Sequence, residues 1–221
     1  MITVHHLEKS RSLRVLWALE ELGLEYRMEV YKRDPETQLA PRSLEKVHPL
    51  GKSPVIVDGD LTLAESGAIL EYLVDRYGDG RLRPAAGTPE RLRYTYWLHY
   101  AEGSLMPPLF LKFLFDRLPG RVPFPLRWAA KGIAKGVLKS FVMPRARQHV
   151  AFMEGELSGR EWFAGPDLTA ADIQLSYPVE AVAARIGLDG QPNLRAWLDR
   201  CHARPAYQRA IERNGPFEIP K

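Results

Sequence analysis

Strand-like and helix-like patterns alternate over the first 80 residues of the chain. Residues 2–5 (ITVH) and 26–31 (YRMEVY) have the alternation of apolar and polar positions that is typical of strands. Between them, apolar side chains recur at helical spacing from Leu13 to Leu22. Gly23 follows at a position where glycine commonly ends a helix. These patterns predict a strand, a helix and a second strand.

The following segment predicts a short helix, a hairpin and a longer helix. A loop with two prolines leads to a helical pattern at 42–47. The Asp-Gly pair at 58–59 is a hairpin signal between the strand patterns at 54–57 and 61–63. Apolar positions then recur at helical spacing over 65–74. The predicted order β-α-β-α-β-β-α is that of a small mixed sheet with helices.

A polar segment rich in glycine and proline divides the chain. Residues 79–89 (DGRLRPAAGTP) have the composition of linkers between domains. From Leu92 to about Arg213 the apolar residues recur at helical spacing. We therefore expect an α/β domain plus an all-α domain, with the α/β domain over 1–80, a linker over 81–89 and the all-α domain over 90–221.

The composition is that of an ordinary globular protein. Of 221 residues, 45% are hydrophobic and 26% are charged, which excludes intrinsic disorder. The apolar stretches are too short for a membrane span, and the first residues do not have the pattern of a secretion signal. A lone cysteine, Cys201, excludes an intramolecular disulfide, and the six histidines do not show metal-ligand spacing. We expect a cytoplasmic protein with no metal site.

The basic residues are concentrated in one segment. The formal net charge is only +4, but residues 117–147 hold eight basic residues and no acidic one. The rest of the chain has 23 basic and 27 acidic residues, so we do not expect a nucleic-acid partner. Arg127, Lys131, Lys135 and Lys139 recur every four residues along one helical face. A solvated face is favoured over contact with an acidic substrate or a membrane surface, because Gly132 and Gly136 interrupt the pattern.

Two motifs in the first domain predict a binding site. Pro54 stands at the entry to a predicted strand, where a cis peptide would turn the preceding backbone groups outward toward an extended ligand. Glu65 and Ser66 stand at a predicted helix start, where free N–H groups and the helix dipole favour a carboxylate. Each motif alone is also compatible with a purely structural turn or helix cap.

With a third motif, the chain resembles the glutathione transferase family over nearly its whole length. In residues 163–173 (FAGPDLTAADI), Thr169 and Asp172 form a capping box, with Leu168 and Ile173 as its hydrophobic staple. The family carries this motif at the start of the core helix of its α domain. The resemblance implies a thioredoxin-like N-terminal domain before the all-α domain. The opening at 10–26 is similar to bacterial and fungal members.

The resemblance also implies a site for glutathione. The main chain of Ser53, ahead of Pro54, would pair with the tripeptide backbone. Ser66 would meet the γ-glutamyl carboxylate, and Glu65 would meet the ammonium group. The candidates for the glycyl carboxylate are Lys52 and Gln38.

The thiol of glutathione has to be activated, because the thiolate is the nucleophile and the free thiol has a pKa of about 8.5. Members of the family use a hydroxyl or a cysteine after the first strand to donate a hydrogen bond to the thiolate. Registering on residues 14–15 places Lys9 at the position of that hydroxyl in many serine-type classes, with Ser10 and Ser12 on either side. We expect Ser10 to be the catalytic thiolate donor and Ser12 to cap the helix. Lys9 or Arg11 could add a positive charge near the sulfur.

The implied function is transfer of glutathione to an electrophile, or reduction of peroxides, by a homodimer without a tightly bound cofactor. Lys9, Tyr96 and Tyr100 are candidates for the electrophile pocket. Two alternatives remain open. One is a non-catalytic glutathione-binding or regulatory protein, since function lies in sites and not in folds. The other is a glutathione-dependent disulfide reductase, which would have to work without a cysteine near the first helix.

Overall fold

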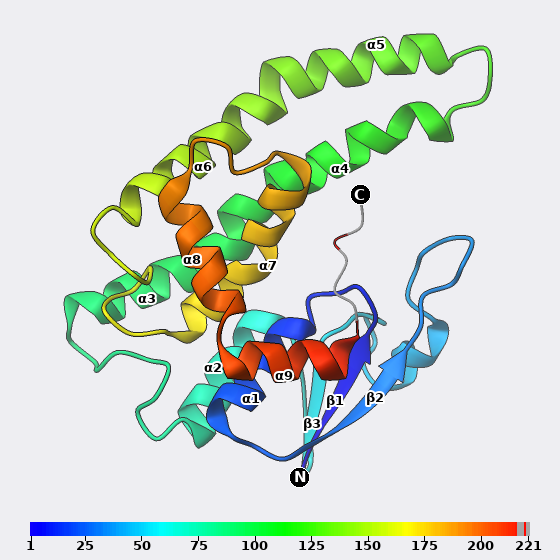
Figure 1. Ribbon diagram of the computed structural model, residues 1–221. Helices are drawn as coiled ribbons and strands as arrows, with labels where there is room; N and C mark the ends of the chain where they lie inside the picture. The colour runs from blue at the N-terminus through cyan, green and yellow to red at the C-terminus, as the bar shows by residue number, and fades with distance from the viewer. Residues whose placement is uncertain (216–218, 220–221) are drawn as a thin grey trace.

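The N-terminal part is a four-stranded mixed sheet with two α-helices and one 3₁₀ helix, in the order that the sequence predicts (Figure 1). The computed structural model describes residues 1–215 and 219. Strand order is β2-β1-β3-β4, in which β1 runs parallel to β2 and antiparallel to β3, and β3 runs antiparallel to β4. The elements are β1 (Ile2–Leu7), α1 (Leu13–Leu22), β2 (Tyr26–Tyr31), a 3₁₀ helix (Arg42–Lys46), β3 (Val55–Asp58), β4 (Leu61–Ala64) and α2 (Ser66–Tyr77).

Local signals account for most of these boundaries. Gly23 ends α1 in the left-handed conformation, with φ 66°, which a residue without a side chain adopts readily. The strand expected at 2–5 extends to Leu7, because β1 stays paired with β2 as far as Tyr31. The predicted second helix is a single 3₁₀ helix.

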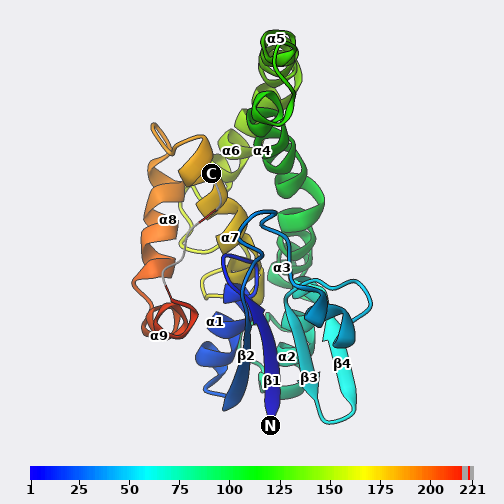
Figure 2. The same ribbon diagram turned by 90° about the vertical axis from the view of Figure 1, so that its right-hand side faces the viewer.

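The C-terminal part is helical (Figure 1). Five-residue π-helical turns at Ala101–Leu105 and Leu138–Val142 join α3 to α4 and α5 to α6. In Figures 1 and 2, α4 and α5 run side by side as a hairpin that projects away from the sheet. The predicted limit of this domain at residue 221 lies outside the described residues. The helices are α3 (Pro89–Tyr100), α4 (Met106–Arg121), α5 (Arg127–Val137), α6 (Met143–Glu156), α7 (Ala170–Arg185), α8 (Pro192–His202) and α9 (Pro205–Asn214).

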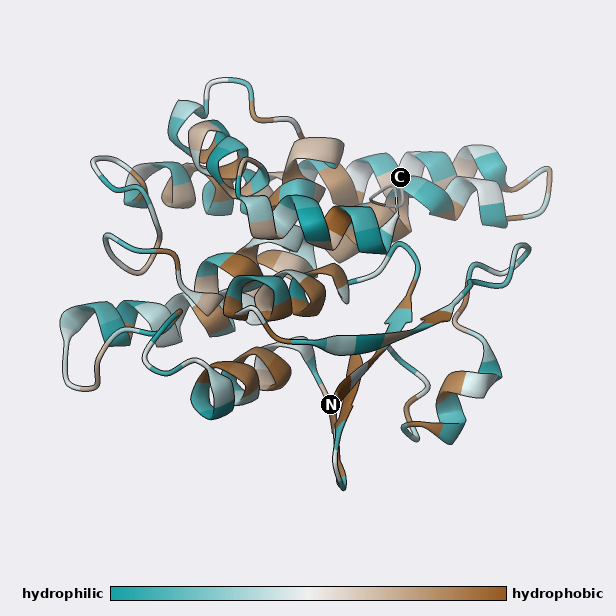
Figure 3. Ribbon diagram, turned by 60° about the horizontal axis from the view of Figure 1, so that its bottom comes forward, coloured by the Kyte–Doolittle hydropathy of each residue, from teal (hydrophilic) through white to brown (hydrophobic). Residues whose placement is uncertain are grey.

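Helix α7 lies at the centre of the core. It packs against α1, α2 and α3, so one apolar cluster runs through both parts of the molecule. Figure 3 shows these apolar positions gathered on the inner helices, while the outer helices alternate between polar and apolar residues. The predicted capping box of Thr169 and Asp172 is confirmed at the start of α7. The buried Asp172 carboxylate also accepts hydrogen bonds from the Phe163 N–H (3.0 Å) and from Trp197 Nε1 (3.1 Å).

The basic segment 117–147 runs from the end of α4 to the start of α6, and α5 within it has one buried face of small residues. Ala130 and Ala134 are buried, whereas Trp128 and Ile133 are largely exposed. Within the described part of the chain, every helix is too short or too polar to cross a membrane.

Candidate functional site

A cavity of 250 Å³ lies where the start of β3 meets the start of α2. The Ser53–Pro54 peptide bond is cis. Five of the six residues predicted to bind glutathione are brought together here. The described residues lining the cavity are Arg11, His48, Leu50, Lys52, Ser53, Pro54, Ala64, Glu65, Ser66 and Glu102.

The side chain of Ser53 is engaged within the fold. Its hydroxyl donates to the carbonyl of His5 (2.9 Å) and accepts from the N–H of Leu7 (3.1 Å), which ties the proline loop to β1. A ligand contact from this residue therefore has to come from its main chain, as the resemblance implies.

Ser66 is the first residue of α2 and is only 5% exposed. Its Oγ accepts hydrogen bonds from Arg14 Nη2 (2.9 Å) and Gln174 Nε2 (3.3 Å). Because Oγ already accepts twice, its own proton is left to donate to a ligand oxygen. Glu65, just before it, has φ 70°, a conformation that is uncommon for residues other than glycine and is often found at functional sites.

A buried cation supports Ser66 from behind. The Arg14 guanidinium is 1% exposed and donates to Glu102 Oε1 (2.7 Å) as well as to Ser66. Burial disfavours ionisation of Glu102, but Arg14 and Arg11 outweigh that effect and hold the pKa of Glu102 below its ordinary value. Arg11 reaches the same carboxylate at 3.1 Å. Sequence reasoning missed Arg14 and Glu102; an arginine among the buried positions of α1 was the one signal available.

The serines after β1 form a buried hydrogen-bonded chain. Ser10 Oγ and Ser12 Oγ lie 2.8 Å apart, and Ser12 Oγ lies 2.7 Å from His6 Nδ1. The N–H of Ser12 also donates to Ser10 Oγ (3.2 Å). Ser12 occupies the N-cap position of α1, but its hydroxyl makes no capping hydrogen bond, because it is engaged with Ser10 and His6. Burial lowers the pKa of His6 to about 4, so the imidazole is neutral at physiological pH.

A second cavity, of 810 Å³, adjoins the first through Arg11, which lines both. Lys9, a candidate for the electrophile pocket, is among the residues that line it. Gln38 also lies here and not in the smaller cavity, and its side-chain amide donates to the Pro35 carbonyl (3.1 Å) in its own loop. The aromatic face of α4, with Phe110 and Phe113, supplies apolar surface.

Tyr96 and Tyr100 line neither of these two cavities. Their rings stack on each other at 5.6 Å between centroids, beside Phe152 of α6. The Tyr100 hydroxyl lies 2.5 Å from His149 Nδ1. The structure thus separates these two tyrosines from Lys9, the third candidate for the electrophile pocket.

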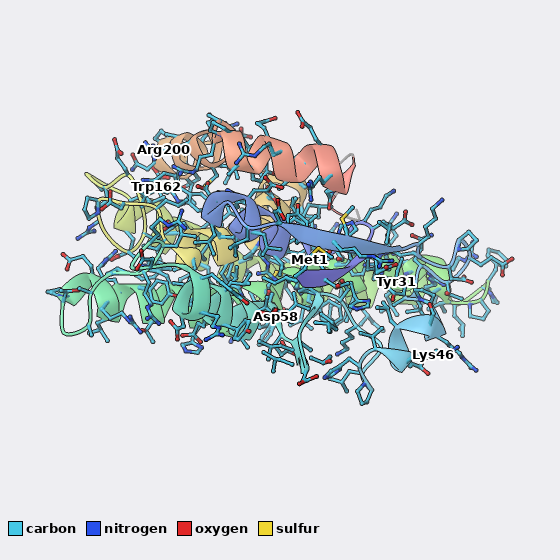
Figure 4. The ribbon with its side chains drawn as sticks, turned by 90° about the horizontal axis from the view of Figure 1, so that it is seen from below. Met1, Tyr31, Lys46, Asp58, Trp162 and Arg200 are labelled. Atoms are coloured by element: carbon cyan, nitrogen blue, oxygen red, sulfur yellow. The ribbon has the colours of Figure 1, made fainter. Side chains whose placement is uncertain are left out.

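A further cavity of 810 Å³ lies along the linker and includes Trp162 and Arg204. Figure 4 shows Trp162 and Arg200 at the opposite end of the molecule from Lys46. Arg204 forms an ion pair with Glu21 of α1, so this region connects the two parts of the molecule.

Across residues 1–215 and 219, no cluster of three or more His, Cys, Asp or Glu residues could hold a metal ion.

Two family models match the chain. The N-terminal domain of glutathione S-transferase matches residues 1–75, and the C-terminal domain of glutathione S-transferase matches residues 135–205. Together they cover more than half of the chain, and their order agrees with the sheet and helices described above. The protein belongs to the glutathione S-transferase family.

Individual relatives agree with this assignment. The chain is 35% identical to glutathione S-transferase 3 of Schizosaccharomyces pombe over 96% of its own length and 88% of that protein's. A glutathione S-transferase structure from Actinobacillus pleuropneumoniae has TM-score 0.84 and 33% identity, covering 99% of this chain and 95% of the other. A family member from Pseudomonas fluorescens, solved with two glutathione molecules bound, has TM-score 0.73 and 28% identity, covering 96% and 92%.

Proposed function

We propose that the protein binds glutathione in the 250 Å³ cavity and activates its thiol for conjugation to electrophiles or for reduction of peroxides. The observation that carries the proposal is the convergence of the Pro54 loop, Glu65 and Ser66 on this one cavity. The glutathione-bound relative from Pseudomonas fluorescens supports it.

The charges of glutathione match the groups of the cavity. The γ-glutamyl carboxylate receives the Ser66 proton and the free N–H groups of the first turn of α2. The exposed Glu65 carboxylate takes the ammonium group. We assign the glycyl carboxylate to Lys52, because Gln38 would first have to release its hydrogen bond to Pro35.

Ser10 is the proposed thiolate donor. In the arrangement that frees its proton, the His6 Nδ1–H donates to Ser12 Oγ, and the Ser12 hydroxyl donates to Ser10 Oγ at 2.8 Å and not to the more distant Leu7 carbonyl at 3.4 Å. Because the Ser12 N–H donates to the same Ser10 oxygen, the Ser10 proton is left for the sulfur. Lowering the thiol pKa by about two units corresponds to about 2.7 kcal/mol of preferential stabilisation of the thiolate.

The proposed reaction is nucleophilic attack by this thiolate. The thiol proton passes to solvent, a carbon–sulfur bond forms, and the leaving group departs with the electron pair of the bond that breaks. With a peroxide, the thiolate attacks oxygen and the O–O bond breaks. This gives an alcohol and a glutathione sulfenic acid, which a second glutathione converts to the disulfide and water.

Disulfide reduction is the second candidate, and the two glutathione molecules bound by the Pseudomonas fluorescens relative favour it. In such a mechanism the first glutathione thiolate attacks the substrate disulfide, forms a mixed disulfide and releases one substrate thiol. The second glutathione thiolate attacks the mixed disulfide, which releases the other substrate thiol and leaves oxidised glutathione. Both of the attacking thiols come from glutathione, so the protein needs no cysteine of its own. Cys201 is unsuited to the role, because burial raises the pKa of its thiol well above the ordinary value.

We also propose that the protein forms a homodimer through the outer aromatic face of α3 and α6. Leu92, Tyr96 and Phe152 are 75%, 48% and 40% exposed. An aromatic surface of this kind is typical of protein interfaces. This placement gives Tyr96 a role outside the electrophile pocket.

The experiment is a comparison of Ser10→Ala with Ser158→Ala, the same change in an exposed turn that lines neither cavity. Each protein is assayed with 1-chloro-2,4-dinitrobenzene, cumene hydroperoxide and a small disulfide, and thiolate absorbance of the glutathione complex is titrated with pH. Ser10→Ala should raise the pKa of bound glutathione and lower turnover, with binding retained, while Ser158→Ala behaves as wild type. An unshifted titration in Ser10→Ala would remove Ser10 from the role. Absence of turnover by wild type with all three substrates would refute the enzymatic proposal.

A further inference from the structure

The 810 Å³ cavity beside the glutathione site is lined by six cationic side chains. None of the described residues that line it is acidic. The cations come from the loop after β1, the segment after β2, and helices α4 and α7. They are Lys9, Arg11, Arg33, Arg117, Arg121 and Arg185.

Hydrogen bonds and ion pairs within the fold fix two of these guanidinium groups beside the cavity. Arg33 donates to three main-chain carbonyls, those of Glu8 (3.2 Å), Gln38 (2.9 Å) and Lys9 (3.3 Å), which fix its position without removing its charge. Arg11 shares the Glu102 carboxylate with Arg14, so one negative charge serves two positive ones. Both arrangements leave net positive charge beside the cavity.

Two further arginines converge on one aromatic ring. The Arg117 guanidinium lies 4.2 Å and that of Arg185 4.9 Å from the centroid of Phe113. Burial lowers the pKa of Arg185, and the like charges of Arg117 and Arg11 lower it further, although Tyr177 and Asp116 oppose this. Arg117 and Arg185 thus place two guanidinium groups against one aromatic wall of the cavity.

The same cavity has a substantial apolar wall. Phe110 is 52% exposed and Leu114 is 45% exposed, and both project from α4 among the lining residues. Large apolar side chains that stay uncovered beside a cluster of cations suit a ligand with two chemical parts.

We propose that this cavity selects electrophiles that carry an anionic group on an apolar body, such as aryl or alkyl carboxylates, sulfonates or phosphates. The anion lies among the arginines, and the apolar body covers Phe110 and Leu114. Arg11, which lines both cavities, marks the side on which the reacting carbon meets the glutathione sulfur. This inference rests on the proposed glutathione transfer.

The test compares two electrophiles that differ mainly in charge, 4-chloro-3,5-dinitrobenzoate and its methyl ester. In both, the thiolate forms a carbon–sulfur bond at the ring carbon that bears chlorine, chloride leaves with the bonding electrons, and the thiol proton goes to solvent. For each compound, kcat/KM is divided by the uncatalysed rate constant, which removes the difference in intrinsic reactivity.

The proteins are wild type, Arg117→Gln, Arg121→Gln and the control Lys131→Gln. Lys131 is an exposed cation on α5 that lines a different cavity, so its variant matches the loss of charge. Wild type should favour the acid by about tenfold or more, because charge-assisted hydrogen bonds are the stronger ones. Each arginine variant should lose most of that preference through the KM of the acid, with the ester unaffected. Added salt should also reduce the preference.

Equilibrium dialysis of both compounds without glutathione measures binding separately from the reaction. Tighter binding of the acid, weakened in both arginine variants and retained in Lys131→Gln, supports the inference even if neither compound is conjugated, an outcome that would refute only glutathione transfer. Equal binding of acid and ester would overturn the inference. So would an acid preference that survives in both arginine variants. If either of these results were found and the ester were still conjugated, the inference would fail but the proposed glutathione transfer would stand.

Discussion

The buried His6 should make the protein less stable as the pH falls below about 6.5. His6 lies on β1, is 1% exposed and has its Nδ1 2.7 Å from Ser12 Oγ. Burial lowers its pKa in the folded protein to about 4, whereas an unfolded chain has a histidine pKa of about 6.5. Above pH 6.5 the imidazole is neutral in both states, and its contribution to stability is fully present.

The size of the effect follows from the separation of the two pKa values. As the pH falls through about 6.5, the unfolded chain binds a proton that the folded protein does not, so the free energy of unfolding falls by about 1.4 kcal/mol per pH unit. Over the interval down to about 4 the loss is about 3 kcal/mol. Below that interval the folded protein is protonated too, and the contribution of this group stops changing.

The assay is urea unfolding at several pH values between 7.5 and 4 for wild type and His6→Asn. An asparagine amide can still donate to Ser12 Oγ but does not titrate. His5 and His149, whose pKa values burial also lowers, are present in both proteins and cancel in the difference. Wild type should lose about 3 kcal/mol relative to the variant across this range. Parallel pH profiles would show that the folded protein accepts a proton on His6 and would refute the reasoning.

Three further changes have defined outcomes. Ser66→Ala should weaken glutathione binding by about 1 to 3 kcal/mol in calorimetry, because a charged ligand group loses its donor; unchanged affinity would exclude this placement of the tripeptide. Asp172→Ala should lower the free energy of unfolding by about 3 kcal/mol or more, because the buried donors of Phe163, Thr169 and Trp197 lose their acceptor. Its activity per folded molecule should be unchanged, and normal melting with lost activity would make Asp172 a site residue. Tyr96→Glu should shift sedimentation from dimer to monomer, and an unaltered dimer would move the interface elsewhere.

The parts of the fold that depend on local sequence could be predicted well. The glycine after α1, the hairpin between β3 and β4 and the capping box of α7 each involve residues within a few positions of one another. Their signals depend on backbone conformation and on hydrogen bonds within one turn. The sequence pattern alone is therefore enough to place them.

The support behind Ser66 could not be predicted in the same way. Arg14 is 52 residues from Ser66 and 88 residues from Glu102, and the contacts exist only because α1, α2 and the π turn meet in space. Tyr96 and Tyr100 show the same limit. Helical spacing shows that they share a face of α3, but only the packed structure shows that this face lies beside Phe152.

The serine loop depends partly on local sequence and partly on contacts that exist only in the packed structure. The family resemblance identified Ser10 and Ser12 as candidates. The third residue of their hydrogen-bonded chain, His6, could not be identified in this way, because its contact depends on how β1 ends beside α1. Ser12 could be predicted as the N-cap residue from its position. The direction of its hydroxyl could not, because that depends on a buried imidazole six residues earlier.

A crystal structure of the protein with glutathione tests the central claim most directly. We predict that the γ-glutamyl carboxylate lies within hydrogen-bond distance of Ser66 Oγ and the first N–H groups of α2. We predict that the tripeptide backbone pairs with the main chain of Ser53, and that the sulfur lies within hydrogen-bond distance of Ser10 Oγ. Glutathione bound away from the Pro54 cavity, or a sulfur atom beyond the reach of Ser10, would contradict the account.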